Sequence, residues 1–137
     1  MSQFIRCATR FKRREWLLGA LQDLGYTRIE EGRDLQVRNY WSGYGYRHPD
    51  QRAEIVVRRL GEGSKSDIGF RLTPDGYELI VNDMDLYTTV DGERRHLEVA
   101  LKTKYNLRRV AAIARELRGS NRQLGRQGQV IRGKIRF

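Results

Sequence analysis

The chain has 137 residues, and its 27 lysines and arginines outnumber its 17 aspartates and glutamates, which gives a formal net charge of +10. This length fits one domain, residues 1–137, which can bury about two thirds of its unfolded surface and needs no disulfide or metal. No run of about 18 apolar residues occurs, which excludes a transmembrane helix. Cys7 is the lone cysteine, which fits a reducing compartment. We therefore expect a cytoplasmic protein, or one of an equivalent compartment such as the plastid stroma.

A strand and a helix are predicted first along the chain. Residues 4–9 place β-favouring side chains at alternate positions, which predicts a strand. Residues 12–24 predict a helix that ends at Gly25. Its apolar stripe is formed by Trp16, Leu17, Ala20, Leu21 and Leu24. Weaker extended stretches follow at residues 27–30 and 35–40.

Three strands are predicted in the middle of the chain. Residues 53–60 are apolar and β-branched and predict a buried strand. Residues 67–72 alternate, and we expect Ile68, Phe70 and Leu72 to face inward. Pro74-Asp75-Gly76 predicts a hairpin turn, because proline presets φ and glycine accepts a positive φ. Residues 77–81 complete the hairpin, with Tyr77, Leu79 and Val81 on one face.

The last part of the chain predicts a long helix and a final strand. The helix spans residues 93–118, with Asp91 as its N-cap and Gly119 just beyond its end. Its apolar side comprises Leu97, Ala100, Leu101, Tyr105, Leu107, Val110, Ala111, Ala114 and Leu117. Residues 130–137 predict the strand. The order of elements predicts an α+β fold, with an antiparallel sheet of about five strands and two helices on one face, a ferredoxin-like variant.

Several segments together carry a resemblance to a known family. They are Leu17-x-x-Ala20-Leu21-x-Asp23-Leu24-Gly25-Tyr26, Asp67-Ile68-Gly69-Phe70-Arg71, Asp75-Gly76-Tyr77-Glu78-Leu79-Ile80 and a tyrosine, Tyr105, midway along the long helix. The chain resembles, over nearly its whole length, the domain-of-unknown-function family of the hypothetical chloroplast reading frame thirty-five, found in cyanobacteria, red-algal plastids and other bacteria. The resemblance implies a small intracellular protein and assigns no catalytic residue. Some members are encoded beside AAA+ ATPases, which implies an adaptor for such an ATPase as one role.

Groups that could carry catalysis are few. Cys7, His48 and His96 are isolated, without the spacing of metal ligands. Asp83-x-Asp85 could hold a divalent cation, although acids at the end of a strand more often accept hydrogen bonds in a loop or cap a helix. No Walker A loop, G-x-S-x-G or C-x-x-C motif is present. We expect no enzyme, no cofactor and no metal.

Cations gather at both ends of the sequence, where no acid precedes Glu15 and none follows Glu116. Arg6 and Arg10 share one face of the first strand if that strand runs far enough. The candidate contacts near the other end are Arg122, Arg126, Arg132, Lys134 and Arg136, of which the last three share one face of the final strand. If the two terminal strands pair, the two sets form one basic face.

An aromatic loop adds a second candidate contact surface. Tyr40, Trp41, Tyr44 and Tyr46 lie beside Arg38 and Arg47. This composition is typical of a stacking platform for bases, each worth about 1–3 kcal/mol. The same rings could instead cover the edge of the sheet or contact another protein.

The basic composition carries the functional expectation. A pI of about 10.2 is typical of nucleic-acid-binding domains, and arginine recognises phosphate through two parallel hydrogen bonds. We expect a non-enzymatic basic module that binds an anionic partner, with RNA or single-stranded nucleic acid as the first expectation. The alternative is a protein–protein adaptor that docks on an acidic surface, for example of an ATPase. No contact with a membrane is expected.

Overall fold

The structure of the chain is a computed structural model that describes residues 3–40 and 51–125, with side chains as far as residue 119. Its elements in chain order are β1 (Phe4–Phe11), α1 (Arg14–Asp23), β2 (Ile29–Val37), β3 (Gln51–Val57), β4 (Ile68–Thr73), β5 (Gly76–Asn82), the 3₁₀ turn η2 (Asp83–Asp85), β6 (Tyr87–Val90), β7 (Glu93–His96) and α2 (Leu97–Gly125). None of the described helices is long and apolar enough to cross a membrane.

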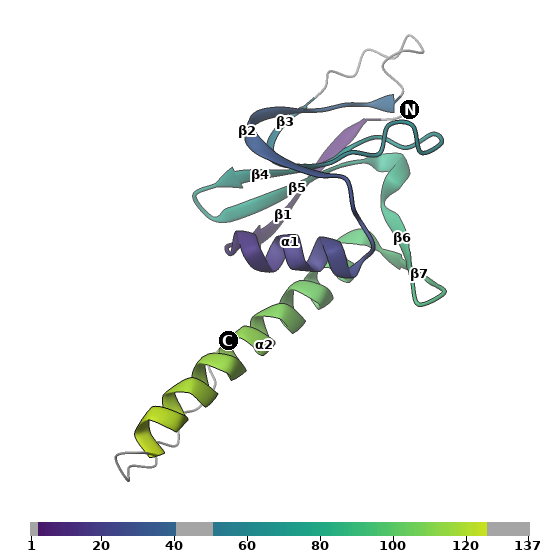
Figure 1. Cartoon of the computed structure of the whole chain (residues 1–137). Helices are drawn as coiled ribbons and strands as arrows, with labels where there is room; N and C mark the ends of the chain where they lie inside the picture. The colour runs from purple at the N-terminus through teal and green to yellow at the C-terminus, as the bar shows by residue number, and fades with distance from the viewer. Residues whose placement is uncertain (1–2, 41–50, 126–137) are drawn as a thin grey trace.

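Five of the strands form one antiparallel sheet in the order β1-β5-β4-β3-β2. The α+β class and the antiparallel five-stranded sheet are therefore confirmed. The strand order departs from that of a ferredoxin-like sheet, in which two βαβ units interleave. Strands β2 to β5 instead lie side by side in the order of the sequence, as in a meander. The connection through α1 consequently places β1 and β2 at opposite edges of the sheet (Figure 1).

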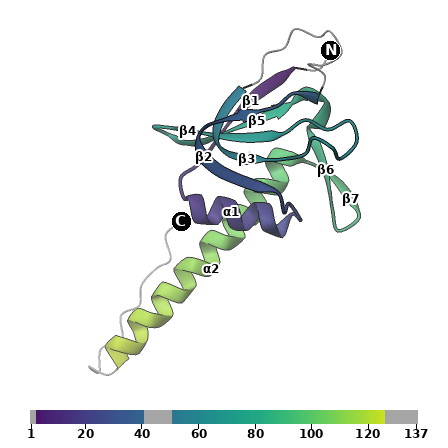
Figure 2. The same cartoon turned by 45° about the horizontal axis from the view of Figure 1, so that its top comes forward.

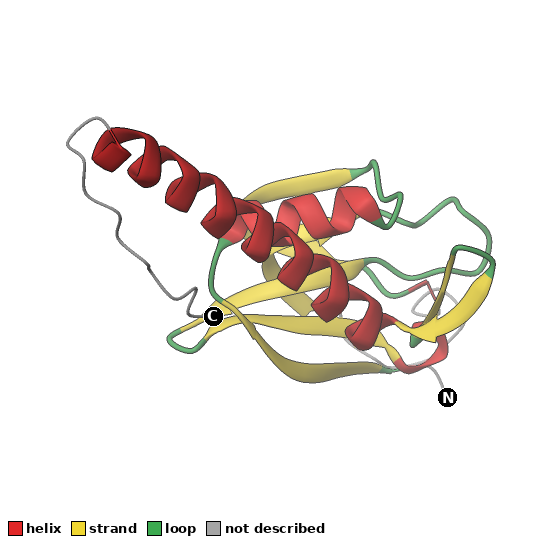
Figure 3. Ribbon diagram, turned by 90° about the horizontal axis from the view of Figure 1, so that it is seen from below, coloured by secondary structure: helices red, strands yellow, loops and turns green. Residues whose placement is uncertain are grey.

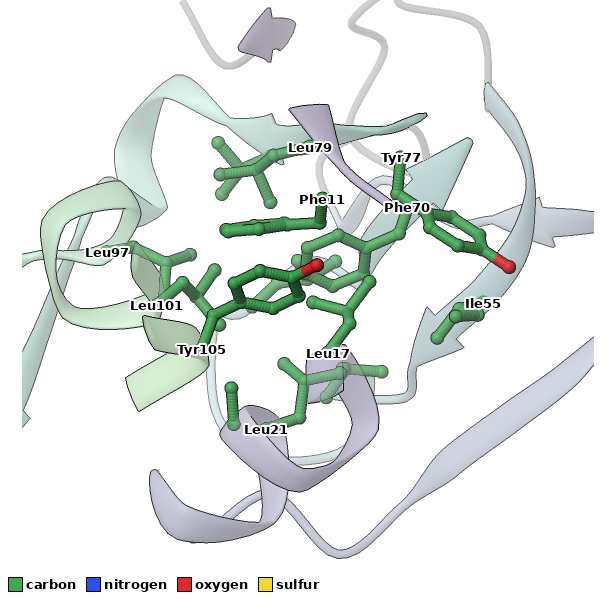
Figure 4. Packing of buried hydrophobic residues seen from close by; sticks show 14 residues of the cluster. Phe11, Leu17, Leu21, Ile55, Phe70, Tyr77, Leu79, Leu97, Leu101 and Tyr105 are labelled. Carbon is green, nitrogen blue, oxygen red and sulfur yellow. The ribbon is translucent and has the colours of Figure 1, made fainter. Parts of the chain in front are cut away.

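Both helices contribute side chains to the same hydrophobic core. Leu17 and Leu21 of α1 and Leu97, Leu101 and Tyr105 of α2 are buried there, and Figure 3 shows both helices in front of the sheet. The sheet contributes Phe11, Ile55, Val57, Ile68, Phe70, Tyr77, Leu79 and Val81 (Figure 4). Tyr77, Leu79 and Val81 therefore share one face, as their spacing predicts. Figure 2 shows that α1 crosses α2 on the side of α2 that faces the strands.

A second, smaller cluster lies on the opposite face of the sheet. It comprises Val37, Ala53, Val56 and Ile80, with Phe4 and Leu35 packed against it. Gly69 is required beneath it, because a Cβ there would lie 2.5 Å from Cγ2 of Val37. The start of β4, from Ile68 to Phe70, is thus buried on both faces of the sheet.

Some predicted boundaries were wrong. The two predicted stretches 27–30 and 35–40 are replaced by the single strand β2 (Ile29–Val37), whose pairing with β3 shifts register between Glu31 and Leu35. Leu72 was expected to face inward, but it is 53% exposed, because it lies near the end of the β4–β5 hairpin. The predicted final strand, residues 130–137, and the aromatic loop from Trp41 lie outside the described residues.

The start and end of the long helix also differ from the prediction. Residues 93–96 form β7, so the helix begins at Leu97. Asp91 is not an N-cap, because Asp91 (φ 51°) and Gly92 (φ 80°) form the two-residue turn between β6 and β7, and both have the positive φ that a type I′ turn needs. Gly119 does not end the helix, which continues to Gly125; a glycine inside a helix costs only about 1 kcal/mol.

Candidate anion-binding pocket

A pocket of ≈ 500 Å³ lies where the end of β1, the start of α1 and the middle of α2 meet. Its lining comprises Arg10, Lys12, Arg13, Trp16, Tyr105, Arg109, Ile113 and Glu116. Four of these side chains are cationic and one is acidic. A hollow with such an excess of one charge concentrates ions of the opposite sign. We call these eight residues the basic pocket.

An irregularity of β1 places Arg10 at the rim of the basic pocket. The pairing of β1 with β5 shifts register between Cys7 and Phe11, and Arg10 has the unusual φ of 56°. Gly76 makes this path possible: a Cβ there would lie 2.8 Å from the carbonyl oxygen of Phe11 and 2.9 Å from the carbonyl carbon of Arg10. β-bulges commonly redirect a side chain in this way.

Tyr105 fixes the segment that carries the next two cations. Its hydroxyl oxygen accepts hydrogen bonds from the backbone N–H groups of Lys12 (3.1 Å) and Arg13 (3.0 Å). The Tyr105 side chain is only 7% exposed, so the acceptor is held rigidly by the core. The connection between β1 and α1 is thereby attached to α2, although these segments lie about ninety residues apart in sequence.

Aromatic rings form one wall of the basic pocket. Trp16 meets Tyr105 edge to face, with ring centroids 5.8 Å apart, and Phe11 packs on Tyr105 at 4.6 Å. The Arg13 guanidinium lies 5.1 Å from the centre of the Trp16 ring, within the range of a cation–π contact. Trp16 is only partly buried. A planar ligand could therefore reach the indole.

Three cations of the basic pocket, Arg10, Lys12 and Arg13, are poorly neutralised by the residues that the structure describes. Arg13 lies 3.4 Å from Glu15, and both side chains are more than half exposed; such a surface pair contributes little. Arg10 and Lys12 make no ion pair with any residue that the structure describes. Arg13 is also the N-cap of α1, and its side chain makes no capping hydrogen bond. The first N–H groups of a helix without such a cap favour an anion nearby.

A second hollow of similar size is electrically mixed. It measures ≈ 490 Å³ and lies between the end of α1 and the β6–β7 hairpin. Arg59 there is paired with Asp85 at 3.8 Å, and Arg94 stacks over Tyr87 at 4.2 Å. Glu62 lines the same hollow as Lys65. The charge of this hollow therefore selects no class of ligand.

The predicted site residues that are described do not converge on one surface. Arg6 lies opposite Ile80 and contacts Gln51 (2.9 Å) and Glu78 (3.6 Å). The pairing of β1 with β5 shifts register between Cys7 and Phe11, so Arg6 and Arg10 do not belong to one regular stretch of strand. The backbone N–H of Tyr40 donates to the Ser66 hydroxyl at 2.9 Å. Of the predicted site residues whose side chains the structure describes, Arg10 alone lines the basic pocket.

Arg38 belongs to a buried ion-pair cluster around Asp67. The Asp67 carboxylate is fully buried and contacts the guanidinium groups of Arg38 (3.0 Å) and Arg58 (2.9 Å). It also accepts the backbone N–H groups of Arg38 and Arg59. Burial alone would raise the pKa of Asp67, but the hydrogen bonds from Arg59 and Arg38 outweigh it and hold the pKa below its usual value. This cluster joins the end of β2 to β3 and β4 and leaves Asp67 no access to a ligand.

The remaining predicted site residues lie outside the described part of the chain. Trp41, Tyr44, Tyr46 and Arg47 belong to residues 41–50, and Arg126, Arg132, Lys134 and Arg136 belong to residues 126–137. Arg122 lies within the backbone span of α2, but its side chain is not described. His48 also lies outside the described residues.

The two aspartates considered as metal ligands, Asp83 and Asp85, accept hydrogen bonds from nearby backbone N–H groups. Asp83 accepts the backbone N–H of Gln3 at 3.1 Å, and Asp85 accepts that of Ser66 at 3.1 Å. His96 accepts the N–H of Glu98 at the start of α2 through Nδ1. No group of three metal-binding side chains occurs among the residues that the structure describes.

Of the residues that line the basic pocket, only Arg10 was among the predicted contacts. Lys12 and Arg13 follow the first strand directly, which was a usable signal, but Trp16 appeared only as part of a core stripe. Arg109 lies about one hundred residues from Arg10 in sequence, and nothing in the local pattern links the two.

A comparison with protein-family models gives one match, over residues 20–136, to a family described as a protein of unknown function (DUF1257). The match spans most of the chain. The chain belongs to the DUF1257 family. This agrees with the expected domain-of-unknown-function family, and it assigns no activity. No curated protein and no solved structure matches the chain. In this member of DUF1257, the basic pocket is the feature that points to a class of ligand.

Proposed function

We propose that this protein is a non-enzymatic module that binds single-stranded nucleic acid, with RNA as the first candidate, and that the basic pocket is its contact site. The observation that carries the proposal is the convergence of Arg10, Lys12, Arg13 and Arg109 around one hollow with a single acid, Glu116. Three separate elements contribute these four cations.

The charges suit a phosphate backbone. Guanidinium groups bind phosphate oxygens through two parallel hydrogen bonds, and a lysine adds a compact charge. Arg10 and Lys12, without ion pairs to described residues, lose no internal partner when they bind a ligand. The free N–H groups at the start of α1 would add to the attraction for one phosphate.

The aromatic wall suits a base. Trp16 is held in place by Tyr105 and Arg13 and keeps part of its ring exposed. A base stacked on such a ring gains about 1–3 kcal/mol regardless of its identity. Because such stacking reads no base-edge pattern, we propose binding with little sequence preference.

A fluorescence titration tests this proposal. Trp16 and Trp41 are the two tryptophans of the chain, so the Trp41→Phe protein reports on Trp16 alone. Titration with an unstructured oligouridylate should quench its emission. If three to four phosphates are contacted, log K should fall against log salt with a slope of roughly −2 to −3. Unchanged Trp16 emission at saturating RNA would remove the basic pocket as the contact site, and the absence of binding at low salt would remove the function.

A further inference from the structure

Helix α2 carries a second apolar face on which no element of the described residues packs. The helix has 29 residues, which corresponds to a length of about 43 Å. Its first half is anchored by buried Leu97, Leu101 and Tyr105. Arg108 adds a bidentate ion pair with Asp23 at 2.7 and 2.8 Å. No side chain from residue 106 to 119 is buried, and Figures 1 and 3 show this part of α2 extending beyond the sheet.

The uncovered face is an apolar stripe that is unbroken from Leu107 onward, with Val99 separated from it by the polar Thr103. Val99 is 53% exposed, Leu107 58% and Val110 40%, and Ala114 and Leu117 are partly exposed. From Leu107 onward the spacing is three, four and three residues, which places these side chains on one face. That face lies roughly 140° around the helix from the buried one. We call Val99, Leu107, Val110, Ala114 and Leu117 the outer stripe.

The spacing of the outer stripe favours a helix as its occupant. Single exposed apolar side chains are common on protein surfaces, whereas an aligned series marks an interaction site. Alternating steps of three and four residues are the repeat with which two helices pack along a shared seam. Arg109, Ile113 and Glu116 of the basic pocket follow a different line along α2, so the outer stripe is a separate surface.

The charges beside the outer stripe decide what kind of helix fits. From residue 99 to 118 the sequence of α2 has one acid, Glu116, and six cations: Lys102, Lys104, Arg108, Arg109, Arg115 and Arg118. Lys102 is paired with Glu98 and Arg108 with Asp23. Lys104, Arg115 and Arg118 have no ion pair with any residue in the described part of the chain. A second copy of α2 packed on this face would place cations beside cations, and the two helices would repel each other.

We propose that the outer stripe docks an amphipathic helix of a protein partner whose apolar side chains are flanked by aspartate or glutamate. The apolar residues of that helix pack on Leu107, Val110 and Leu117, and its acids pair with Lys104, Arg115 and Arg118. The protein then carries two independent contacts, the basic pocket for nucleic acid and the outer stripe for an acidic protein.

The test uses the full chain and synthetic helices of defined sequence. The probe is a series of labelled peptides with leucine at the a and d positions of successive heptads and glutamate at the flanking positions; the control peptides carry lysine instead. Fluorescence anisotropy should show that the acidic peptides bind and the basic ones do not. Leu107→Ser/Val110→Ser should weaken this binding at least tenfold, whereas Leu72→Ser, which replaces a residue that is 53% exposed on β4, should leave it unchanged.

Three outcomes would overturn the inference. The first is equal peptide binding by the wild type and by Leu107→Ser/Val110→Ser. The second is a concentration-dependent dimer, seen by sedimentation and abolished by the same two substitutions, which would make a second copy the occupant. The third is tighter binding to vesicles of anionic lipid than to any acidic peptide. Binding of oligouridylate by Leu107→Ser/Val110→Ser should stay unchanged, so failure here is distinguishable from failure of the nucleic-acid proposal.

Discussion

The Tyr105 hydroxyl oxygen lies 3.0 Å from the backbone nitrogen of Arg13 and accepts its hydrogen bond. One side chain of α2 thereby holds the residue from which α1 starts. Because the same hydroxyl also accepts the N–H of Lys12, the position of two pocket cations depends on a residue that itself contributes no charge.

Replacing Tyr105 with phenylalanine removes this acceptor and keeps the ring that packs on Phe11 and Trp16. We expect the free energy of unfolding to fall by about 1–2 kcal/mol, because two N–H groups lose their partner. Oligouridylate binding should weaken as well, since Lys12 and Arg13 are no longer fixed. Urea denaturation and fluorescence anisotropy measure the two effects. Unchanged values of both would show that the hydroxyl does not organise the pocket.

Gly76 is predicted to be intolerant of even a small side chain. Its φ of 117° and the 2.8 Å approach to the Phe11 carbonyl oxygen leave no space for a methyl group, so Gly76→Ala should destabilise the fold by about 2 kcal/mol or more. Gly92→Ala is the matched control, because Gly92 also has a positive φ (80°) but no atom near the position of a Cβ. Gly92→Ala should lower the free energy of unfolding by about 1 kcal/mol. Thermal denaturation that ranks the two variants in the opposite order would contradict this view of the β1 irregularity.

Asp67 should dominate the acid sensitivity of the fold. Its pKa is held below the usual value in the folded state, so it contributes stability above its unfolded pKa of about 3.9 and loses that contribution as the pH falls through the folded pKa. Asp67→Asn should lower the free energy of unfolding by about 3 kcal/mol at neutral pH, because Arg38 and Arg58 lose their buried partner.

Denaturation curves recorded from neutral pH down to about pH 2 check this prediction. The wild type should lose stability steeply in the acid range, and Asp67→Asn should lose less over the same range. Parallel pH profiles for the two proteins would show that other carboxylates carry the acid sensitivity.

The sheet and its core were predictable from sequence because their patterns are local. Alternation in residues 77–81 and the Asp75-Gly76 turn define β5, and the spacing of Leu17, Ala20 and Leu21 defines the buried face of α1. The β6–β7 hairpin was missed because Arg94, Arg95 and His96 show no alternation of apolar residues, and the helical pattern that starts at Leu97 was extended over them. The turn signal, Asp91-Gly92, was present and was interpreted as a helix cap.

The basic pocket could not be predicted as a unit, for a different physical reason. Its cations come from β1, the β1–α1 connection and α2, and only the tertiary packing around Tyr105 brings them together. The strand pattern even suggested that Arg6 and Arg10 act together, because alternation assumes a regular strand. The register shift between Cys7 and Phe11, which no local sequence signal indicates, interrupts the regular strand between these two arginines.

Two double variants separate binding at the basic pocket from binding by overall charge. Arg10→Gln/Lys12→Gln removes two pocket cations, and Arg33→Gln/Arg71→Gln removes two exposed cations outside the pocket that also lack ion pairs with described residues. The two double variants have the same net charge. Affinity for oligouridylate, measured by fluorescence anisotropy at a fixed low salt concentration, should fall at least tenfold for the pocket pair and less than threefold for the control pair. The slope of log K against log salt should become shallower by about 1.4 for the pocket pair alone. Equal losses for the two pairs would contradict the account, because binding would then follow net charge.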